Sequence, residues 1–378
     1  MDYEFNDQEK GFLDRIQDLA DTLARDCDLE TGDAGTAEAN LRTTLEYLAA
    51  TPYLGILLAD QPGDAPGFPA LVAAMEILGA ASPSLFLSIE SSTRIFGRLV
   101  RTWGGEAAEG NWLAPLTRGR LIGAVALSEE AMNVENDPLA TTGREDGDAI
   151  VVNGRKQYVV NAPVADWIAV AGSVDERPAL FLVEKGQAGL RILDRIDTLG
   201  YDDVLISGIE LADCRVPRSR VLWPGDTGSM TGNLRMWENQ VLMAASLGMM
   251  RASFDSARDW AKTHKSGGRP VIAYQEVGFK LSEMLTLLQT SELYAYRTAW
   301  TAESKPKEAE SLTWCAKVFC TEAAETVAGQ ALRILSGNGF QSGHAAERAF
   351  RGAKYNQIAG TSTEMARVHI GDSALGRL

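Results

Sequence analysis

The side chains best suited to nucleophilic or metal chemistry are few and scattered in this sequence. The three histidines, His264, His344 and His369, each stand among unlike neighbours. A histidine-based metal site or a serine–histidine–aspartate triad therefore has little to build on. The cysteines have neither metal-ligand nor redox spacing, and we expect reduced, buried thiols. They are Cys27, Cys214, Cys315 and Cys320.

The charge of the chain excludes some classes of partner. Its 378 residues include 36 Lys and Arg against 51 Asp and Glu, a formal net charge of −15 at pH 7. Such a chain repels nucleic acid and anionic membranes unless a basic patch overrides the charge, and the sequence shows no such patch. It also lacks the apolar core of a signal peptide and any uninterrupted apolar run of about 18 residues. We therefore expect a cytoplasmic protein with no nucleic-acid partner and no membrane span.

Helices are expected at both ends of the chain. Asn6 followed by Glu9 resembles a capping box, and the apolar residues after it keep to one helical face. Further N-terminal segments are rich in Ala and Leu, and the C-terminal runs are long and nearly free of interior proline, which is typical of antiparallel bundle helices. The expected helical segments are 37–57, 69–81, 86–118, 233–264, 272–303 and 309–336.

Between 121 and 225 the pattern changes to short β-branched runs with turn signals. Asp146-Gly147 and Asn153-Gly154 are dipeptides typical of hairpin turns, and the density of short strands predicts a small barrel or sandwich. The predicted fold is mostly α with a central β domain. Its parts are an N-terminal α-helical domain (1–120), a middle β domain (121–228) and a C-terminal four-helix bundle (229–378).

Two long motifs accompany this order of elements. The first covers 165–228 and includes Val216-Pro217; the second covers 347–371 and contains the turn Gly360-Thr361-Ser362. With them the chain resembles the acyl-CoA dehydrogenase family over essentially its whole length. The resemblance implies FAD bound between the β domain and the C-terminal bundle, and oxidation of the Cα–Cβ bond of an acyl-CoA thioester with the flavin as hydride acceptor. It also implies dimers or tetramers and an electron-transfer flavoprotein or similar acceptor.

The base of that reaction is not at its usual place. In most of the family a Glu directly precedes the Gly-Thr pair of the closing motif, but here Ala359 precedes Gly360 in a motif one residue shorter. A minority of members carry the Glu on the first long bundle helix, ten residues before a glycine, and Glu238 stands ten residues before Gly248. The resemblance thus implies Glu238 as the catalytic base, although the next residue, Asn239, is normally an arginine. The other interpretation of Glu238 is a solvated carboxylate in the first turn of its helix.

The flavin-binding motifs are altered too. Only Ser128 and Glu129 survive of one loop, Tyr158 replaces a tryptophan, and the segment at His264 lacks the family's arginine and aromatic residue. Segments 264–275 and 336–340 are implied to reach the cofactor of a neighbouring subunit. The cofactor-binding residues that the resemblance implies are Leu127, Ser128, Tyr158, Val160, Asn161, His264, Ser266, Gln275, Ser336, Gly337, Thr361 and Thr363.

Substrate contacts follow from the same resemblance. The implied substrate-binding residues are Val134, Trp237, Gly360 and Arg367. Segment 89–93 matches a helix that lines the acyl pocket of the family. Glu90 or Arg94 reaching into that pocket would favour a polar or carboxylated acyl chain.

Three hypotheses stay open. The first is a working FAD-dependent dehydrogenase with Glu238 as base. The second is a degenerate, non-catalytic subunit that assembles with an active paralogue, because the departures cluster at cofactor and base positions while the fold motifs persist. The third is a family enzyme of changed chemistry, such as a desulfinase, a decarboxylase-type relative or one acting on carrier-protein thioesters. The sequence leaves open whether the oligomer contains one kind of chain or two.

Overall fold

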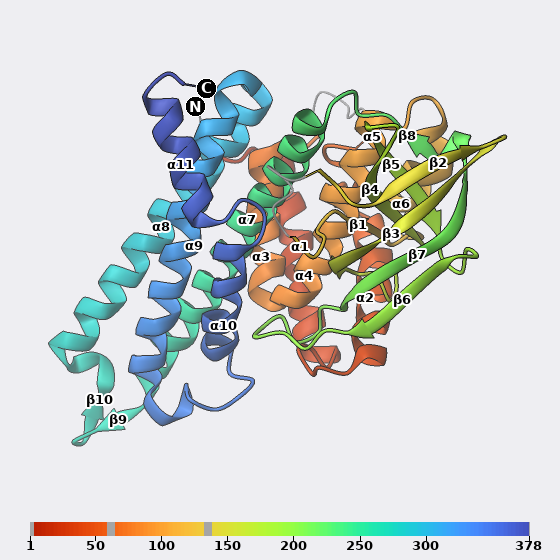
Figure 1. The fold of residues 1–378 in the computed structure, drawn as a ribbon. Helices are drawn as coiled ribbons and strands as arrows, with labels where there is room; N and C mark the ends of the chain where they lie inside the picture. Colours follow the sequence, from red (N-terminus) through yellow and green to blue (C-terminus); the bar gives the residue numbers. More distant parts are fainter. Residues whose placement is uncertain (1–3, 59–64, 132–137, 378) are drawn as a thin grey trace.

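The computed structural model describes residues 4–58, 65–131 and 138–377 (Figure 1). Helices dominate both ends of the chain and a mixed sheet lies between them in sequence, so the predicted fold class is confirmed. The N-terminal helices are α1 (Asp7–Asp26), α2 (Ala34–Ala49), η1 (Tyr53–Gly55), α3 (Phe68–Ala81), α4 (Pro83–Glu90), the π-helical η2 (Ser91–Gly97), α5 (Arg98–Trp103), the π-helical η3 (Glu109–Leu113) and α6 (Ala114–Thr117).

The start of α1 follows from its sequence. The Asn6 side chain accepts hydrogen bonds from the backbone of Gln8 and Glu9, and the Glu9 carboxylate accepts one from the Asn6 backbone. This is the predicted capping box, which satisfies N–H groups that have no partner inside the helix. Phe12 and Ile16 on its apolar face are fully buried.

The sheet contains most of the strands. Its order is β6-β7-β3-β2-β4-β5-β8, and β1 pairs in parallel with β4. The strands are β1 (Gly123–Ala126), β2 (Thr142–Asp146), β3 (Ala149–Val160), β4 (Trp167–Val174), β5 (Arg177–Glu184), β6 (Leu190–Arg195), β7 (Ile206–Pro217) and β8 (Val221–Leu222).

One of the two predicted hairpin turns is present. Asp146, the last residue of β2, pairs with Ala149 of β3, so the chain reverses at Gly147-Asp148, one residue later than the predicted dipeptide, with Gly147 at a positive φ of 64°. The turn predicted at Asn153-Gly154 is wrong, because this pair lies inside the long strand β3, at an irregularity in its register with β7. A side chain at Gly154 would meet Thr141 at 2.4 Å. The glycine here permits close approach within the sheet rather than a reversal of the chain.

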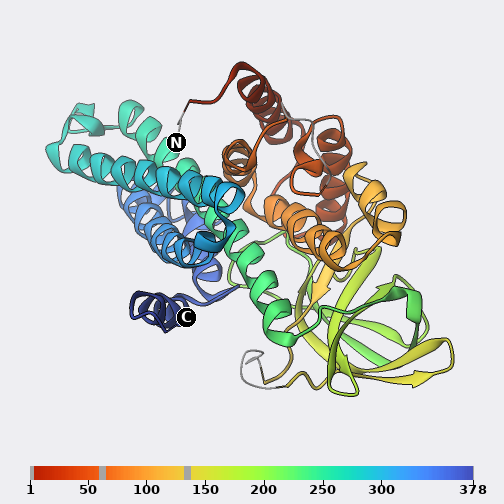
Figure 2. The ribbon, with the colours of Figure 1, turned by 90° about the horizontal axis from the view of Figure 1, so that it is seen from above.

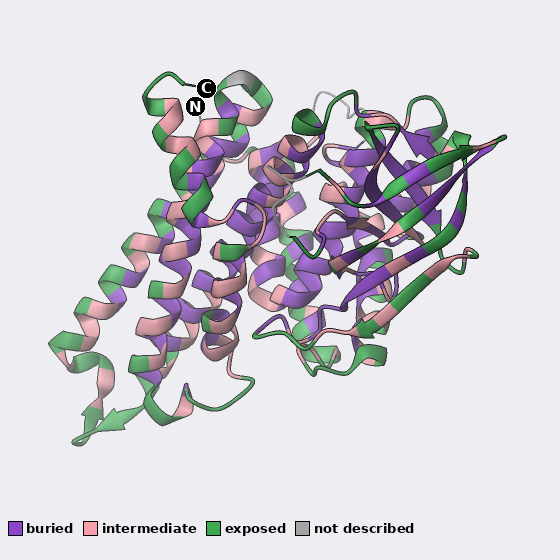
Figure 3. Cartoon of the chain, viewed as in Figure 1, coloured by how far each residue is buried: buried purple, intermediate pink, exposed green. Residues whose placement is uncertain are grey.

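The C-terminal part is helical apart from one small hairpin. Its elements are α7 (Thr227–Thr263), β9 (Lys265–Ser266), β10 (Arg269–Pro270), η5 (Val271–Ala273), α8 (Gln275–Ser304), α9 (Pro306–Leu335), η6 (Ser336–Asn338), α10 (Ala345–Ile358) and α11 (Thr363–Ala374). Figure 3 shows that the β9–β10 end is exposed, whereas the buried faces of α7 and α9 lie in the interior.

Helix α7 connects the parts of the molecule. Its first turns, with Met230 and Leu234, pack in an apolar core shared with the sheet and α5, while Val241 and the residues after it pack in the core of the bundle and the N-terminal helices. Figure 2 shows α7, in green, running from the sheet into the bundle. A side chain in the middle of α7 can therefore face the sheet, the N-terminal helices and the bundle at once.

Two general features follow from the described ranges. No helix within them combines the length and apolar character needed to cross a membrane. They also contain no cluster of His, Cys, Asp and Glu that could hold a metal ion. The four cysteines are free thiols, of which Cys214 and Cys320 are buried and Cys27 and Cys315 are partly exposed.

Candidate active site

A cavity of about 90 Å³ lies where η2, β1, β3, α7 and α10 meet. Five of the residues singled out in the sequence analysis lie around it, namely Leu127, Ser128, Tyr158, Val160 and Glu238. The remaining described residues of its wall are Ser91, Ile95, Val125, Gln157, Leu234 and Tyr355. Residues from distant parts of the chain are thus brought to one place, with Glu238 as the carboxylate in the wall.

Glu238 is not a first-turn carboxylate. Helix α7 begins at Thr227, six residues before the predicted start, so Glu238 lies in the interior of the helix, where the field of the helix end has faded. Burial raises the pKa of Glu238 above its ordinary value, against the opposing effects of the Arg235 and Lys317 charges and the Gly360 backbone N–H. A carboxylate with raised proton affinity in the wall of a cavity is suited to accept a proton.

The Gly360-Thr361 turn packs directly against this part of α7. The Thr361 backbone N–H donates to Asn239 Oδ1 at 2.9 Å, and Asn239 Nδ2 donates to the Thr361 hydroxyl at 3.0 Å. Gly360 has a φ of +66°, and a Cβ there would lie 2.5 Å from Asn239 Oδ1. Asn239, which stands where the family resemblance has arginine, therefore fastens the turn to α7.

Lys317 of α9 holds the same turn from the other side. Its ammonium donates to the carbonyl oxygen of Thr361 at 2.6 Å and to that of Gln357 at 2.9 Å, and the side chain is fully buried. Burial lowers the pKa of Lys317 to about 8, against the opposing charges of Glu238, Glu364 and Glu322. A buried lysine is thus placed next to the candidate base.

Two tyrosines frame the cavity. Tyr158 is half exposed and has a positive φ of 56°, an uncommon conformation for a residue with a side chain. Tyr355 packs edge-on against the Tyr201 ring, with centroids 5.2 Å apart. Burial, and then the charge of Glu238, raise the pKa of Tyr355. Tyr355 therefore stays a neutral phenol beside the carboxylate.

Comparison with known proteins places this geometry in a family. Residues 124–214 match the acyl-CoA dehydrogenase middle domain, and residues 231–375 match the acyl-CoA dehydrogenase C-terminal domain. The mitochondrial short-chain specific acyl-CoA dehydrogenase of Rattus norvegicus is 30% identical over 330 residues, covering 84% of this chain and 79% of the relative. The chain belongs to the acyl-CoA dehydrogenase family.

Solved structures share the acyl-CoA dehydrogenase fold. The structure of butyryl-CoA dehydrogenase from Megasphaera elsdenii has a TM-score of 0.89 at 21% identity, covering 99% of this chain and 100% of the other. An FAD complex of PigA has a TM-score of 0.86 at 19% identity and covers 100% of both chains. These likenesses concern the fold.

The lining of the cavity can be compared with the parts of FAD, the flavin cofactor seen in a neighbouring solved structure. Its lining combines apolar and aromatic residues, such as Val125, Leu127 and Tyr158, with polar groups from Ser128 and Gln157. Such a surface suits a flat ring system. No described residue of the wall is a lysine or arginine. The lining residues therefore suit contact with part of the flavin ring, and cations for the diphosphate would have to come from elsewhere.

Several residues implied for the cofactor lie away from this cavity. Asn161 is fully buried and donates to the Ser88 carbonyl. Thr361 and Thr363 are buried in and after the turn beside α7. A further group lies at the far end of the bundle, around the β9–β10 hairpin and η6 (Figure 1). This group comprises His264, Ser266, Gln275, Ser336 and Gly337.

The residues implied for substrate binding are dispersed. Gly360 lies beside Glu238. Arg367, on α11, pairs with Glu322 of α9 at 2.6 Å. Val134 lies outside the described residues. Trp237 faces a different cavity, on another side of α7.

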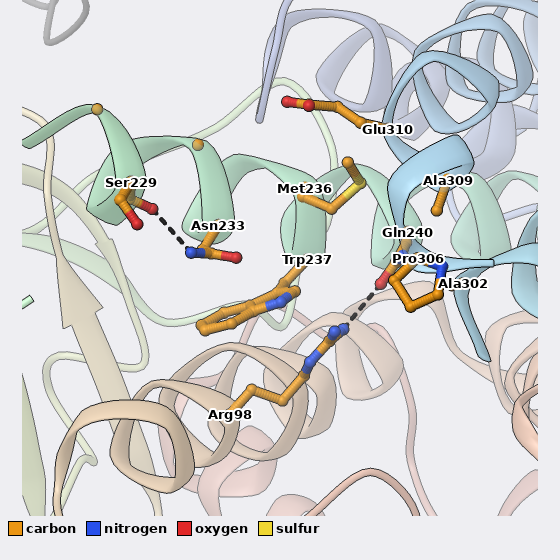
Figure 4. Close-up of a pocket in the computed structure, with 12 residues that line it drawn as sticks. Arg98, Ser229, Asn233, Met236, Trp237, Gln240, Ala302, Pro306, Ala309 and Glu310 are labelled. Carbon is orange, nitrogen blue, oxygen red and sulfur yellow. Dashed lines mark hydrogen bonds between the residues drawn. The ribbon is translucent and has the colours of Figure 1, made fainter. Parts of the chain in front are cut away.

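This second cavity is larger, about 370 Å³, and lies between α5, α7 and the junction of α8 with α9 (Figure 4). The Arg98 guanidinium stacks over the Trp237 ring, 4.8 Å from its centroid, and donates to Gln240 Oε1 at 2.8 Å. Burial and the neighbouring Arg94 lower the pKa of Arg98 to about 9. Trp237 is therefore held by packing with Arg98 and does not share the cavity of Glu238.

The condition stated for Glu90 and Arg94, that one of them reaches into the pocket, is not met at this cavity. Both side chains are buried and neither lines the cavity; Ser91 and Ile95 do. The Tyr53 hydroxyl donates to Glu90 at 2.7 Å, Glu90 and Arg94 lie 3.5 Å apart, and Arg94 donates to the backbone carbonyls of Tyr53 and Leu54. These charges hold η2 against the N-terminal helices and give no support for a carboxylated acyl chain.

Two residues of this site, Tyr355 and Lys317, were not predicted from the sequence, and neither was the role of Asn239 in holding the turn. One signal was available for Lys317, because it lies on the same helical face as Thr313, Ala316 and Cys320, all of which are buried. A lysine on the apolar face of a helix is seldom buried without a specific partner.

Proposed function

We propose that the protein is an FAD-dependent acyl-CoA dehydrogenase that oxidises the Cα–Cβ bond of an acyl-CoA thioester, with Glu238 as catalytic base. The observation that carries this proposal is the Glu238 carboxylate, with its raised pKa, in the wall of a cavity formed with β1, β3 and η2. Removing the α-proton of a thioester requires a carboxylate with these properties. Membership of the acyl-CoA dehydrogenase family supports the same reaction.

In this proposal the residues of the chain divide the work. Glu238 accepts the α-proton, and the Gly360 backbone N–H and Lys317 keep the carboxylate available in its ionised form. Leu127, Ser128, Tyr158 and Val160 would hold the flavin ring. FAD, when bound, supplies the acceptor for the hydride that leaves the β-carbon.

The diphosphate and adenosine would be held by a second copy. The residues implied for them lie around the β9–β10 hairpin and η6. This is the end of the bundle that lies far from the sheet (Figure 1), and none of these residues lines the cavity of the same chain. We therefore propose that the active form is at least a dimer, and that an electron-transfer flavoprotein or a similar acceptor reoxidises it.

The test begins with colour. The chain is purified alone and its visible absorption recorded before and after incubation with FAD. We expect a flavin spectrum that bleaches anaerobically with members of a series of acyl-CoA thioesters, butyryl-CoA among them. A protein that stays colourless with excess FAD would overturn the proposal and favour a non-catalytic subunit that needs a paralogue.

A further inference from the structure

Lys317 is a costly residue to bury. A buried ammonium loses its hydration, and proteins usually compensate with a direct carboxylate partner. The hydrogen bonds that the described residues offer to Lys317 both come from backbone carbonyls, those of Gln357 and Thr361. These atoms belong to the end of α10 and to the turn that follows it. The Lys317 ammonium therefore holds this turn in position.

The turn connects Lys317 to Glu238. Thr361 accepts from Lys317 through its carbonyl, and it is bound to Asn239 through both its backbone N–H and its hydroxyl. Asn239 is the residue after Glu238 on α7. The turn is thus clamped between α9 and α7, and this clamp fixes the Gly360 N–H where it favours the ionised form of Glu238.

We infer that Lys317 and Asn239 are positioning residues for Glu238, holding the Gly360-Thr361 turn so that its backbone N–H and the Lys317 ammonium keep the base ionised and in place. This inference rests on the proposed function of Glu238. Neither residue touches the reacting atoms; both act through the turn.

Other charges around the pair define the background. Glu238 also faces Arg235 of α7 and Tyr355 of α10. Lys317 also faces Glu322 of α9 and Glu364 of α11. Removing the Lys317 charge takes away one of the two cations that favour the Glu238 carboxylate and leaves Arg235 in place.

The first experiment needs neither flavin nor substrate. Thermal unfolding midpoints are measured at neutral pH for wild type, Lys317→Met, Glu238→Gln and the double variant. We expect E238Q to raise the midpoint of the K317M protein more than it raises that of wild type, because without Lys317 the partly buried carboxylate keeps only Arg235 as a compensating cation. Equal shifts in the two backgrounds would overturn the inference. Lys354→Met, which removes a bundle lysine paired with Glu325, is the control and should give equal shifts.

The second experiment uses the holoenzyme, with butyryl-CoA as probe. The anaerobic rate of flavin reduction is followed against pH. Loss of the Lys317 charge raises the pKa of Glu238, so K317M should move the acidic limb upward; a one-unit shift lowers the rate about tenfold on that limb. Lys317→Arg should restore the limb, whereas a purely structural role would lower the midpoint and leave the limb in place. If wild type reduces no flavin, the proposed function fails, and the first experiment still decides the inference.

Discussion

Two buried lysines in this protein, Lys156 and Lys317, are associated with glutamates in opposite ways. In the β domain, Lys156 donates directly to Glu129 at 2.7 Å, and the same carboxylate accepts from the Ala140 and Thr141 backbones and from the Thr141 hydroxyl. In the bundle, Lys317 donates to carbonyls of a turn, and Glu238 remains at the wall of a cavity.

The difference appears in the proton affinities of the carboxylates. For Glu129, burial is outweighed by the hydrogen bonds from Lys156 and Thr141, which lower its pKa. For Glu238, burial prevails and raises the pKa. Both lysines have a pKa lowered to about 8 by burial. Glu129, whose carboxylate is fully hydrogen-bonded, stabilises the structure. Glu238, whose lysine is hydrogen-bonded to the turn instead of to the carboxylate, keeps the capacity to accept a proton.

The largest expected effect concerns the role of the Glu238 carboxylate in the reaction. Glu238→Gln should lower the anaerobic rate of flavin reduction by butyryl-CoA about 10²–10⁴-fold, because the amide cannot accept the proton. Glu308→Gln, which removes an exposed carboxylate of α9 paired with Lys305, should leave the rate nearly unchanged. An E238Q protein as fast as wild type would remove Glu238 from the mechanism.

The next effect separates the two lysines by stability. Lys156→Met leaves the Glu129 charge buried without its cation and should cost about 3–5 kcal/mol of unfolding free energy. The measurement is chemical denaturation followed by circular dichroism. Adding Glu129→Gln should recover part of the loss. A K156M protein as stable as wild type would show that the Lys156–Glu129 pair does not stabilise the fold.

A smaller effect concerns the turn. Gly360→Ala forces a side chain into the positive-φ region and against Asn239, and should cost about 1–3 kcal/mol. Gly371→Ala on α11 is the matched control, since a Cβ there meets nothing within 4 Å. It should be neutral or slightly stabilising. Equal unfolding midpoints for the two variants would contradict the clamp described for Thr361.

The smallest effect is that E129Q and E238Q should change the stability of the protein in opposite directions at neutral pH. Because the pKa of Glu129 is lowered, its ionised form stabilises the folded protein above the ordinary pKa of 4.5, and this stabilisation is lost as pH falls through the folded pKa. E129Q should therefore be less stable than wild type at neutral pH, and the difference in stability should close on acidification. Because the pKa of Glu238 is raised, E238Q should be more stable than wild type at neutral pH, and this gap closes as pH falls towards 4.5. Unfolding midpoints against pH test both; gaps of the same sign would contradict the comparison.

Much of the fold could be predicted from local patterns. The capping box at Asn6, the hairpin at Asp146-Gly147 and the long C-terminal helices all depend on residues close in sequence. Asn153-Gly154 misled because the same dipeptide serves a close approach within a sheet, and the deciding neighbour, Thr141, is remote from the pattern.

The site, too, was predictable only where a local pattern in the sequence marks it. Glu238 is recognised by its spacing to Gly248, but its partners come from other helices. Asn239 meets Thr361 across 122 positions of sequence, and Lys317 meets it across 44. Such contacts arise only when α7, α9 and α10 pack together, and no local pattern encodes them.

The π-helical segment η2 bears on how the length of this chain can vary. In a π-helix each hydrogen bond spans one residue more than in an α-helix, so η2 accommodates an additional residue between α4 and α5 without breaking the helix. A single deletion within 91–97 can therefore be absorbed by returning this stretch to α-helical winding, while a deletion inside α3 would rotate every buried residue that follows it. The wall of the cavity formed by Ser91 and Ile95 thus lies in a segment of the N-terminal helices that can lose a residue and reshape the pocket without dismantling the core.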